Sequence, residues 1–549
     1  MSVSLSLRNY MSSDVQATAS LSARSHDNYT DNPNHERRWL VLCIVALAQL
    51  TVVLDSTIVS IALPDAQKDL GISNLDRQWV VTAYALAFGS LLLLGGRIAD
   101  FWGRKRSFMV GMAGFAVASA VGGFAQTGIQ LFVARAGQGV FAALLAPAAL
   151  AILTTTFVGE KERAKAFAVY GAISGGGAAI GLLLGGGLTQ YLDWRWCLLV
   201  NVPIALFAIA VTLPIVKETK AHGDTSYDLP GTVLVAIGLG SLVYGFTKAE
   251  HGWLETQTLL FIGIGLLALA AFVLVEKRTA NPLLPLSVPW HRDRGAAFIG
   301  SALVGAALLG GSLYLTFYLQ IVMGLSPVMS GVGILPMATF VVLASGIAAQ
   351  LTTRIGPKPL MVVGPILAAT GLFLLTQIGV HTSYWTHVFP GLATFGFGLG
   401  LLMVPMQNLA LLRVPNHDAG AASALANAAL QVGGALGTAL FTTVYASAKD
   451  SFQADNPAPT PPPGFPANAI PSDLSNATPL THEQIAAMPA PAQDFANKVM
   501  DWVFGTEVSG YAHAFGWAGA LILAISPLVM VLVRAKKGDL PTEGAVGMH

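Results

Sequence analysis

Long apolar stretches separated by short polar segments run through almost the whole chain. Each stretch has about 17 to 25 residues, enough for a helix to cross the roughly 30 Å hydrocarbon core of a bilayer. The pattern predicts fourteen spans, at 39–62, 77–97, 106–125, 129–153, 164–188, 196–216, 229–247, 257–276, 296–318, 328–352, 359–379, 384–410, 421–446 and 511–534. We therefore expect an all-α, polytopic membrane protein.

Composition and charge agree with this class and add an orientation. The chain is 54% hydrophobic and 11% charged, unlike a water-soluble globular protein. Of its 30 Lys and Arg residues, 23 fall in the two tails and in every second connection between spans. Because cytoplasmic loops carry the excess of Lys and Arg, we expect both termini in the cytoplasm and the spans in the cell (inner or plasma) membrane. The formal net charge of +1 gives no reason to expect a nucleic-acid partner.

A short internal repeat predicts two related halves. The pattern Ile98-x-Asp100-x-x-Gly103-x-Lys105 follows span 2, and Leu351-x-Thr353-x-x-Gly356-x-Lys358 follows span 10. Duplicated helical halves are typical of secondary transporters. The predicted organisation is a disordered cytoplasmic tail at 1–37, a six-helix half at 38–216, an inserted helix pair with linkers at 217–290, a second six-helix half at 291–534 and a cytoplasmic tail at 535–549.

The second half contains a long outer loop, predicted at 447–510. Its first part is rich in proline, from Pro457 to Pro466, and we expect it to be largely unstructured. A short amphipathic helix is expected within 483–504. We interpret the loop as a tolerated surface insertion, with a partner-binding or substrate-gating element as the alternative.

The first span holds one carboxylate, Asp55, which by our count is the only acidic residue deep within any span. A charge in hydrocarbon is costly and marks a functional-site hypothesis. Arg135 in span 4 is its expected partner, because both residues lie roughly 9 to 11 Å below the outer boundary at 1.5 Å per residue. A buried carboxylate beside a cation can gain or lose a proton as its surroundings change. The alternative is a structural ion pair that only fixes helix packing.

The connection between spans 2 and 3 combines glycines with mixed charges, in Gly96, Asp100, Gly103, Arg104 and Lys105. Glycine permits a tight turn, and Asp100 can make charge-assisted bonds with the neighbouring cations. We expect this inner gate motif to hold the two halves together on the cytoplasmic side. An ordinary positively charged loop would leave Asp100 and the glycines unexplained.

Span 5 carries glycine at every fourth position, at Gly177, Gly181 and Gly185. One face of the helix is therefore nearly bare backbone, which permits a close helix contact.

These motifs resemble the major facilitator superfamily, and within it the fourteen-helix drug:proton antiporter branch. The resemblance rests on the run from Leu54 to Pro64, the inner gate motif, the glycine stripe and a span-4 motif with Arg135, Gln138 and Gly139. It covers nearly everything from 38 to 534 except the long outer loop. It implies two six-helix halves plus an inserted helix pair, and a role in proton coupling for Arg135. Leu182 stands where the antiporter motif usually has proline, which weakens antiport relative to symport.

Candidate cavity residues are Tyr84, Tyr318, Asn427 and Gln431. Asn427 and Gln431 are four apart and share a helical face; the alternative is that they bond across helices.

The sequence therefore predicts a proton-coupled exporter of lipophilic compounds, cationic ones among the candidates, that works by alternating access. The sequence contains no ATP-binding motif and no catalytic or metal-ligand constellation, so we expect no enzyme, no metal and no cofactor besides the proton gradient. The expected partners are the bilayer, small lipophilic substrates and protons, and we expect a monomer. The alternatives are a dedicated exporter of a single natural product or lipid, and a non-transporting membrane receptor that uses the outer loop.

Overall fold

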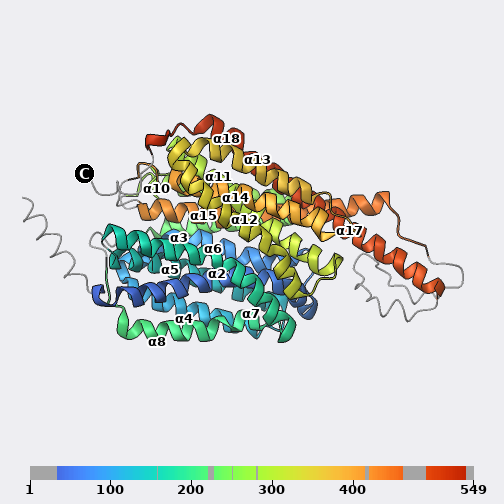
Figure 1. Cartoon of the computed structure of the whole chain (residues 1–549), viewed down its shortest axis with the longest axis horizontal. Helices are drawn as coiled ribbons and strands as arrows, with labels where there is room; N and C mark the ends of the chain where they lie inside the picture. Colours follow the sequence, from blue (N-terminus) through green and yellow to red (C-terminus); the bar gives the residue numbers. More distant parts are fainter. Residues whose placement is uncertain are drawn as a thin grey trace, which may run out of the picture.

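The computed structural model describes residues 34–157, 159–220, 228–249, 252–279, 282–414, 419–460 and 490–539. In this part of the chain the elements are helices that run side by side along one axis (Figure 1). Residues 1–33 of the predicted tail at 1–37, the C-terminal residues 540–549 and most of the proline-rich segment lie outside the described residues. The last residues of that tail, His35–Arg37, form a short helical turn.

The N-terminal half contains six long helices or helix pairs. They are α2 (Arg38–Leu70), α3 (Trp79–Trp102), α4 (Arg104–Gly123), α5 (Gly128–Thr156), α6 (Glu160–Tyr191), and the pair α7 (Trp196–Leu199) and α8 (Asn201–Ile215). A short segment, η2 (Asp76–Gln78), precedes α3.

The C-terminal half has the same number of spans. They are α11 (Arg292–Phe317), α12 (Pro327–Ile355), α13 (Pro357–Leu375), α14 (Phe389–Ala410), α15 (Ala419–Asp455), and the pair α17 (Ala490–Leu523) and α18 (Ile525–Leu532). The inserted pair is α9 (Leu229–Lys248) and α10 (Thr256–Glu276). Short segments are η1 (His35–Arg37), η4 (Tyr318–Val322), η5 (Tyr384–Val388) and η8 (Lys537–Asp539).

Thirteen of the described spans are long and apolar enough to cross a membrane. The fourteenth predicted span is α4, which begins with the cations Arg104, Lys105 and Arg106 and contains several glycines and serines. It lies against α5 and α8 in the same bundle. The predicted fourteen-helix, all-α architecture is confirmed.

The internal repeat is visible in the packing. In the first half α2 packs on α6, and α3 and α4 pack on α5; in the second, α11 packs on α15, and α12 and α13 pack on α14. Gly103 and Gly356 occupy equivalent turns, and both have positive φ, at 131° and 86°. Lys105 Nζ donates to the carbonyl of Leu213 at 2.7 Å, and Lys358 Nζ to that of Val533 at 2.9 Å. Each lysine thus ties its turn to the last helix of its own half.

The predicted loop at 447–510 is wrong at both ends. Helix α15 continues to Asp455 and α17 begins at Ala490, so the connection between them is much shorter. No proline interrupts α15 before Pro457. Both helix extensions contain polar residues, so hydropathy does not predict them as part of a span. They project beyond the bundle at the right of Figure 1 and are joined by the Trp502 indole, which donates to the Asn456 carbonyl at 2.7 Å. The helix expected within 483–504 is confirmed for its described part.

The halves meet along α3 with α15 and α6 with α12. Two hydrogen bonds join them directly at the end where α2 finishes. Gln320 Nε2 donates to the Ile61 carbonyl at 2.9 Å, and the backbone N–H of Val328 donates to Gln190 Oε1 at 3.3 Å. This end, which the charge pattern predicts to be the outer one, is closed.

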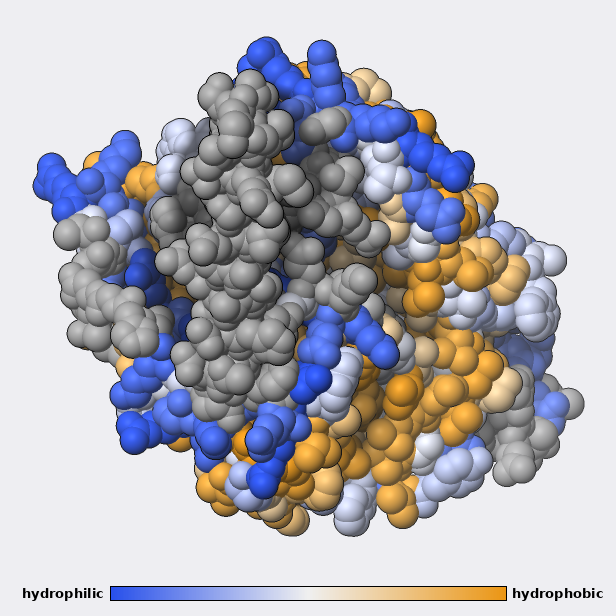
Figure 2. Space-filling view, turned by 60° about the vertical axis from the view of Figure 1, so that its left-hand side comes forward, coloured by the Kyte–Doolittle hydropathy of each residue, from blue (hydrophilic) through white to orange (hydrophobic). Residues whose placement is uncertain are grey.

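The opposite end bears the start of α2 and the end of α18 (Figure 1). Figure 2 shows hydrophilic residues gathered around it, and a broad hydrophobic surface along the side of the bundle. The distribution is that of a bundle with an aqueous end and a lipid-facing side.

Candidate functional site

The predicted pair of Asp55 and Arg135 is formed in the interior of the N-terminal half. Asp55 on α2 is 0% exposed and Arg135 on α5 is 1% exposed. The Arg135 Nη1 to Asp55 Oδ2 distance is 2.5 Å. The sequence predicts that the two residues lie at the same depth and can pair, and the structure shows this ion pair. A buried charge of this kind is stable only with its partner in place.

Two amides complete the shell of the carboxylate. Gln138 Nε2 donates to Asp55 Oδ1 at 2.8 Å, and Asn201 Nδ2 donates to the same oxygen at 2.9 Å. Gln138 lies one turn after Arg135 on α5, while Asn201 is the first residue of α8. The sequence places Gln138 in the span-4 motif, but it gives no sign that Asn201 reaches the carboxylate from a third helix.

Arg135 has partners besides Asp55. Its Nε donates to the Val80 carbonyl at 2.9 Å and its Nη1 to Gln138 Oε1 at 2.7 Å. Its guanidinium carbon lies 4.6 Å from the centre of the Tyr84 ring. The arginine is therefore held by α3 and α5 as well, and it can stay in place when the charge of Asp55 changes.

Two polar atoms at the edge of this shell lack partners among the described residues: the Tyr84 hydroxyl and Asn201 Oδ1. Buried polar groups are normally hydrogen-bonded. Unused bonding capacity beside a carboxylate allows the shell to rearrange without losing existing bonds.

The glycine stripe of α6 packs against the part of α2 that carries Asp55. A Cβ atom on Gly181 would collide with Thr57 Oγ1, and one on Gly185 would lie 3.0 Å from Ile58 Cα. A Cβ on Gly177 would lie 3.2 Å from Val53. The expected close helix contact is confirmed, and it fixes α2 from the side opposite the charge.

Leu182, the residue in place of the usual proline, leaves α6 as one continuous helix. Its carbonyl lies at the junction of the halves, since a Cβ on Gly331 of α12 would lie 2.5 Å from it.

The inner gate motif is ordered, but its bonds to described residues join it to its own half and to the linker after α8, and not to the C-terminal half. Asp100 accepts from Arg104 Nη2 at 3.0 Å. Glu218, after α8, accepts from the backbone N–H groups of Lys105 at 3.0 Å and Arg106 at 3.1 Å. Gly103 makes room for this carboxylate, because a Cβ there would lie 2.6 Å from it. The predicted link between the halves stays a prediction. It applies to a conformation in which the predicted cytoplasmic end is closed.

Packing requires glycine at position 139 but not at position 96. A Cβ on Gly139 would meet the Tyr84 carbonyl, which brings α5 close to α3, whereas one on Gly96 would lie 3.6 Å from Pro147.

The four candidate cavity residues have different surroundings. Tyr84 is buried against Arg135, and Gln431 on α15 packs near Gly89 of α3. Tyr318 does not line a cavity in this conformation: it is 0% exposed, and its hydroxyl donates to the Gly379 carbonyl at 3.0 Å inside the C-terminal half.

Asn427 is exposed, and its amide nitrogen bonds to the Ser423 carbonyl of its own helix at 3.1 Å. Its neighbours on α15 place it between two contacts, since Gln431 faces α3 and Leu430 faces α11. Asn427 thus lies on α15 between its contacts with α3 and with α11.

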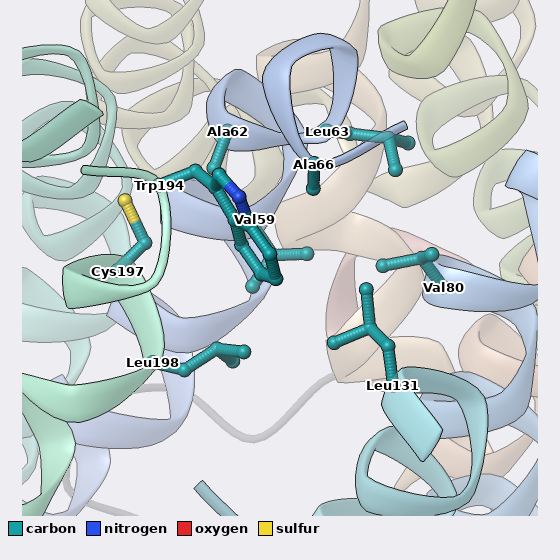
Figure 3. Close-up of a pocket in the computed structure, with 9 residues that line it drawn as sticks. All are labelled: Val59, Ala62, Leu63, Ala66, Val80, Leu131, Trp194, Cys197 and Leu198. Atoms are coloured by element: carbon teal, nitrogen blue, oxygen red, sulfur yellow. The ribbon is translucent and has the colours of Figure 1, made fainter. Parts of the chain in front are cut away.

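A small apolar cavity of about 10 Å³ lies near the closed end of the N-terminal half (Figure 3). Val59, Leu63, Trp194 and Cys197 are among its lining residues. A volume of this size is at the limit for one water molecule, so this cavity is not a substrate site.

Asp55 is not the only buried carboxylate among the described residues, since Asp228, Glu276, Asp293 and Glu507 are buried as well. Glu507 lies on α17, is 8% exposed and pairs with Lys449 Nζ at 2.6 Å. The sequence places Glu507 within the predicted outer loop, after the charged residues Asp494, Lys498 and Asp501.

Comparison with known proteins gives one family. The model of the Major Facilitator Superfamily matches residues 45–438. A puromycin resistance protein of Streptomyces alboniger is 50% identical over 423 residues, covering 76% of this chain and 84% of that protein. A tetracenomycin C resistance and export protein of Streptomyces glaucescens is 35% identical over 418 residues, covering 75% and 76%.

Solved structures show the same fold. A bacterial homolog of the human lysosomal transporter Spinster has a TM-score of 0.56 at 15% identity, covering 92% of this chain and 98% of that one. A peptide transporter in complex with sulfate has a TM-score of 0.56 at 14% identity, covering 90% and 96%. This multi-pass membrane protein, with its two repeated six-helix halves and its resistance and export relatives, belongs to the major facilitator superfamily.

Proposed function

We propose that this protein is a proton-coupled antiporter that exports lipophilic, antibiotic-like compounds by alternating access. The observation that carries the proposal is the carboxylate of Asp55, buried between three helices and bonded to Arg135, Gln138 and Asn201. Names of relatives supply the transport direction, since they refer to resistance and export. The proton gradient would be the energy source, with no resident cofactor.

Protonation would change the bonding around Asp55 in a defined way. A proton on Oδ2 ends the ion pair, and Arg135 then relies on the Val80 carbonyl, Gln138 and the Tyr84 ring. A proton on Asp55 Oδ1 points at the amide N–H groups of Gln138 and Asn201, which cannot accept it. The Asn201 amide can then rotate and accept the proton with its own Oδ1, which has no partner among the described residues. Either event loosens α2 from α5 and α8.

The proposed cycle couples this change to movement of the halves. With Asp55 charged, the halves are closed at the outer end, as in this structure, and the compound enters from the cytoplasm or inner leaflet. The halves then rock apart at the outer end, where Asp55 takes a proton and the compound leaves. The Lys and Arg distribution supports an orientation in the cell membrane with both termini in the cytoplasm. In this scheme the protein acts as a monomer in the bilayer.

The experiment is pH-dependent binding of puromycin and of ethidium to purified protein. A compound that loads against charged Asp55 binds wild type less tightly as the pH falls, and Asp55→Asn removes this dependence. The matched control is Asp494→Asn, which changes an exposed carboxylate on α17 paired with Lys498. A pH dependence that survives in Asp55→Asn would exclude Asp55 as the coupling group.

A second candidate function is dedicated export of one natural product. Two relatives are named for single compounds, puromycin and tetracenomycin C. A strain with and without the gene should be compared for resistance to puromycin, lincomycin, tetracenomycin C and ethidium. Resistance to one compound favours the dedicated exporter, and resistance to several favours the multidrug exporter.

A further inference from the structure

A second set of buried charges lies where the halves meet and has no part in the Asp55 site. Arg77, in η2 of the N-terminal half, is 2% exposed. Its guanidinium carbon lies 3.8 Å from the ring centre of Phe317, 5.1 Å from that of Tyr445 and 5.9 Å from that of Tyr314. Its Nη1 lies 3.4 Å from Asn74 Oδ1, and its Nη2 has no hydrogen-bond partner among the described residues. Aromatic faces are therefore its main surroundings.

The aromatic residues around Arg77 all belong to the C-terminal half. We call them the aromatic cage, which consists of Tyr314 and Phe317 on α11, Tyr445 on α15, and Tyr511 on α17. The rings of Tyr445 and Tyr511 stack with centroids 5.6 Å apart, and Tyr314 lies 5.4 Å from Tyr445.

Bonds inside the C-terminal half hold this cage without Arg77. The hydroxyls of Tyr445 and Tyr511 donate to Glu507 Oε2 at 2.5 and 2.8 Å. The hydroxyl of Tyr314 lies 3.0 Å from Thr442 Oγ1. The cage is preorganised, so it keeps its shape when the N-terminal half moves away.

The charges around the cage balance without Arg77. Glu507 already pairs with Lys449 Nζ at 2.6 Å. The guanidinium is thus one positive charge in excess, and the electron-rich ring faces stabilise it. When Arg77 leaves, the cage loses one monovalent cation, and the ring faces that Arg77 covers become free to bind another.

We propose that the aromatic cage binds the ammonium or guanidinium group of an exported compound at the predicted outer end. Arg77 occupies the cage while this end is closed and leaves it when the halves part. On closing, Arg77 competes with the bound cation and drives it out. This inference rests on the proposed function only in that the halves must separate at this end.

The test is binding of choline to purified full-length protein in nanodiscs of phosphatidylglycerol, which supplies no choline headgroup. Arg77→Ala empties the cage, and we expect it to bind choline at least tenfold more tightly than wild type. An uncharged isostere, 3,3-dimethylbutan-1-ol, should show no such gain. Replacing Phe317 as well, in Arg77→Ala/Phe317→Leu, should reverse the gain.

The matched control is Arg195→Ala. Arg195 also lies near the closed end, 4.6 Å from the Trp194 ring, but it is bound to Asp69 at 2.7 Å and no cage surrounds it. It should behave like wild type. Arg77→Gln, a longer polar replacement, serves as a second variant if Arg77→Ala does not fold.

Equal binding of choline and its isostere by the folded Arg77 variants would overturn the proposal. The result is independent of proton coupling, because no pH gradient is applied. Asp55→Asn in the Arg77→Ala background should keep the choline site even though it abolishes coupled export.

Discussion

At the scale of single residues, the Asp55 carboxylate depends on donors from two other helices. Arg135 and Gln138 come from α5, and Asn201 from α8. Hydrogen bonds to a charged group are each worth about 1.5–3 kcal/mol. The loss of any one donor should therefore favour the neutral, protonated form.

Asn201→Ala should move the pH dependence of ligand binding toward higher pH, because the charged Asp55 carboxylate loses one hydrogen-bond donor. Binding to charged Asp55 would then be lost at a higher pH than in wild type. The measurement is puromycin affinity across pH 5 to 9. Gln126→Ala, which removes an exposed amide bonded to the Phe124 carbonyl, is the control. An unchanged midpoint in Asn201→Ala would show that this amide does not stabilise the charged form.

Arg135→Ala should destabilise the protein more than the double variant Asp55→Asn/Arg135→Gln. Removing one partner of a buried pair leaves an uncompensated charge, at a cost of about 3–5 kcal/mol. The double variant leaves no such charge. Thermal unfolding of the detergent-purified proteins measures the difference. Similar loss of stability in both variants would contradict the interpretation that the pair is mutually dependent.

At the scale of helices, the position of α2 is set by the glycine face of α6. The sequence predicts this contact well, because glycine at every fourth residue has few other uses in an apolar helix. The pairing of Asp55 with Arg135 is equally predictable, since opposite charges at one depth have few other partners. Asn201 and Glu507 are different. Asn201 is the single polar residue in the apolar stretch 197–211, and Glu507 follows a segment rich in charged residues. Which groups either side chain contacts depends on tertiary packing that hydropathy does not report.

Gly181→Ala should lower the thermal stability and the export rate, because its Cβ would collide with Thr57 Oγ1. Thr57→Ala in the same chain should recover much of both. Gly187→Ala is the matched control, since a Cβ at this position of α6 meets nothing within 4 Å. If Gly181→Ala and Gly187→Ala have equal effects, the contact with Thr57 does not explain the loss.

At the scale of the whole molecule, the two halves are separate bundles that meet at one end. Their direct bonds link α2 with η4, and α6 with α12. The repeat of about 250 residues predicted the two bundles. The sequence could not predict that the predicted outer end is closed in this structure. The same sequence adopts every conformation of the transport cycle.

A disulfide across the closed end should arrest export. Gln190→Cys/Val328→Cys, in a chain with Cys43 and Cys197 replaced by Ala, joins α6 to α12 where Val328 bonds to Gln190. Oxidation should stop efflux from cells, and reduction should restore it. Each single cysteine variant is the control. Full efflux with the cross-link formed would show that this end does not have to open.

The central claim is that a proton on Asp55 drives export, and uphill transport in proteoliposomes tests it most directly. With an imposed pH gradient and puromycin at equal concentrations on both sides, wild type should accumulate the compound against its gradient. Asp55→Asn should abolish accumulation while still binding the compound, and Asp494→Asn should match wild type. Uphill transport by Asp55→Asn at the wild-type rate would contradict the account.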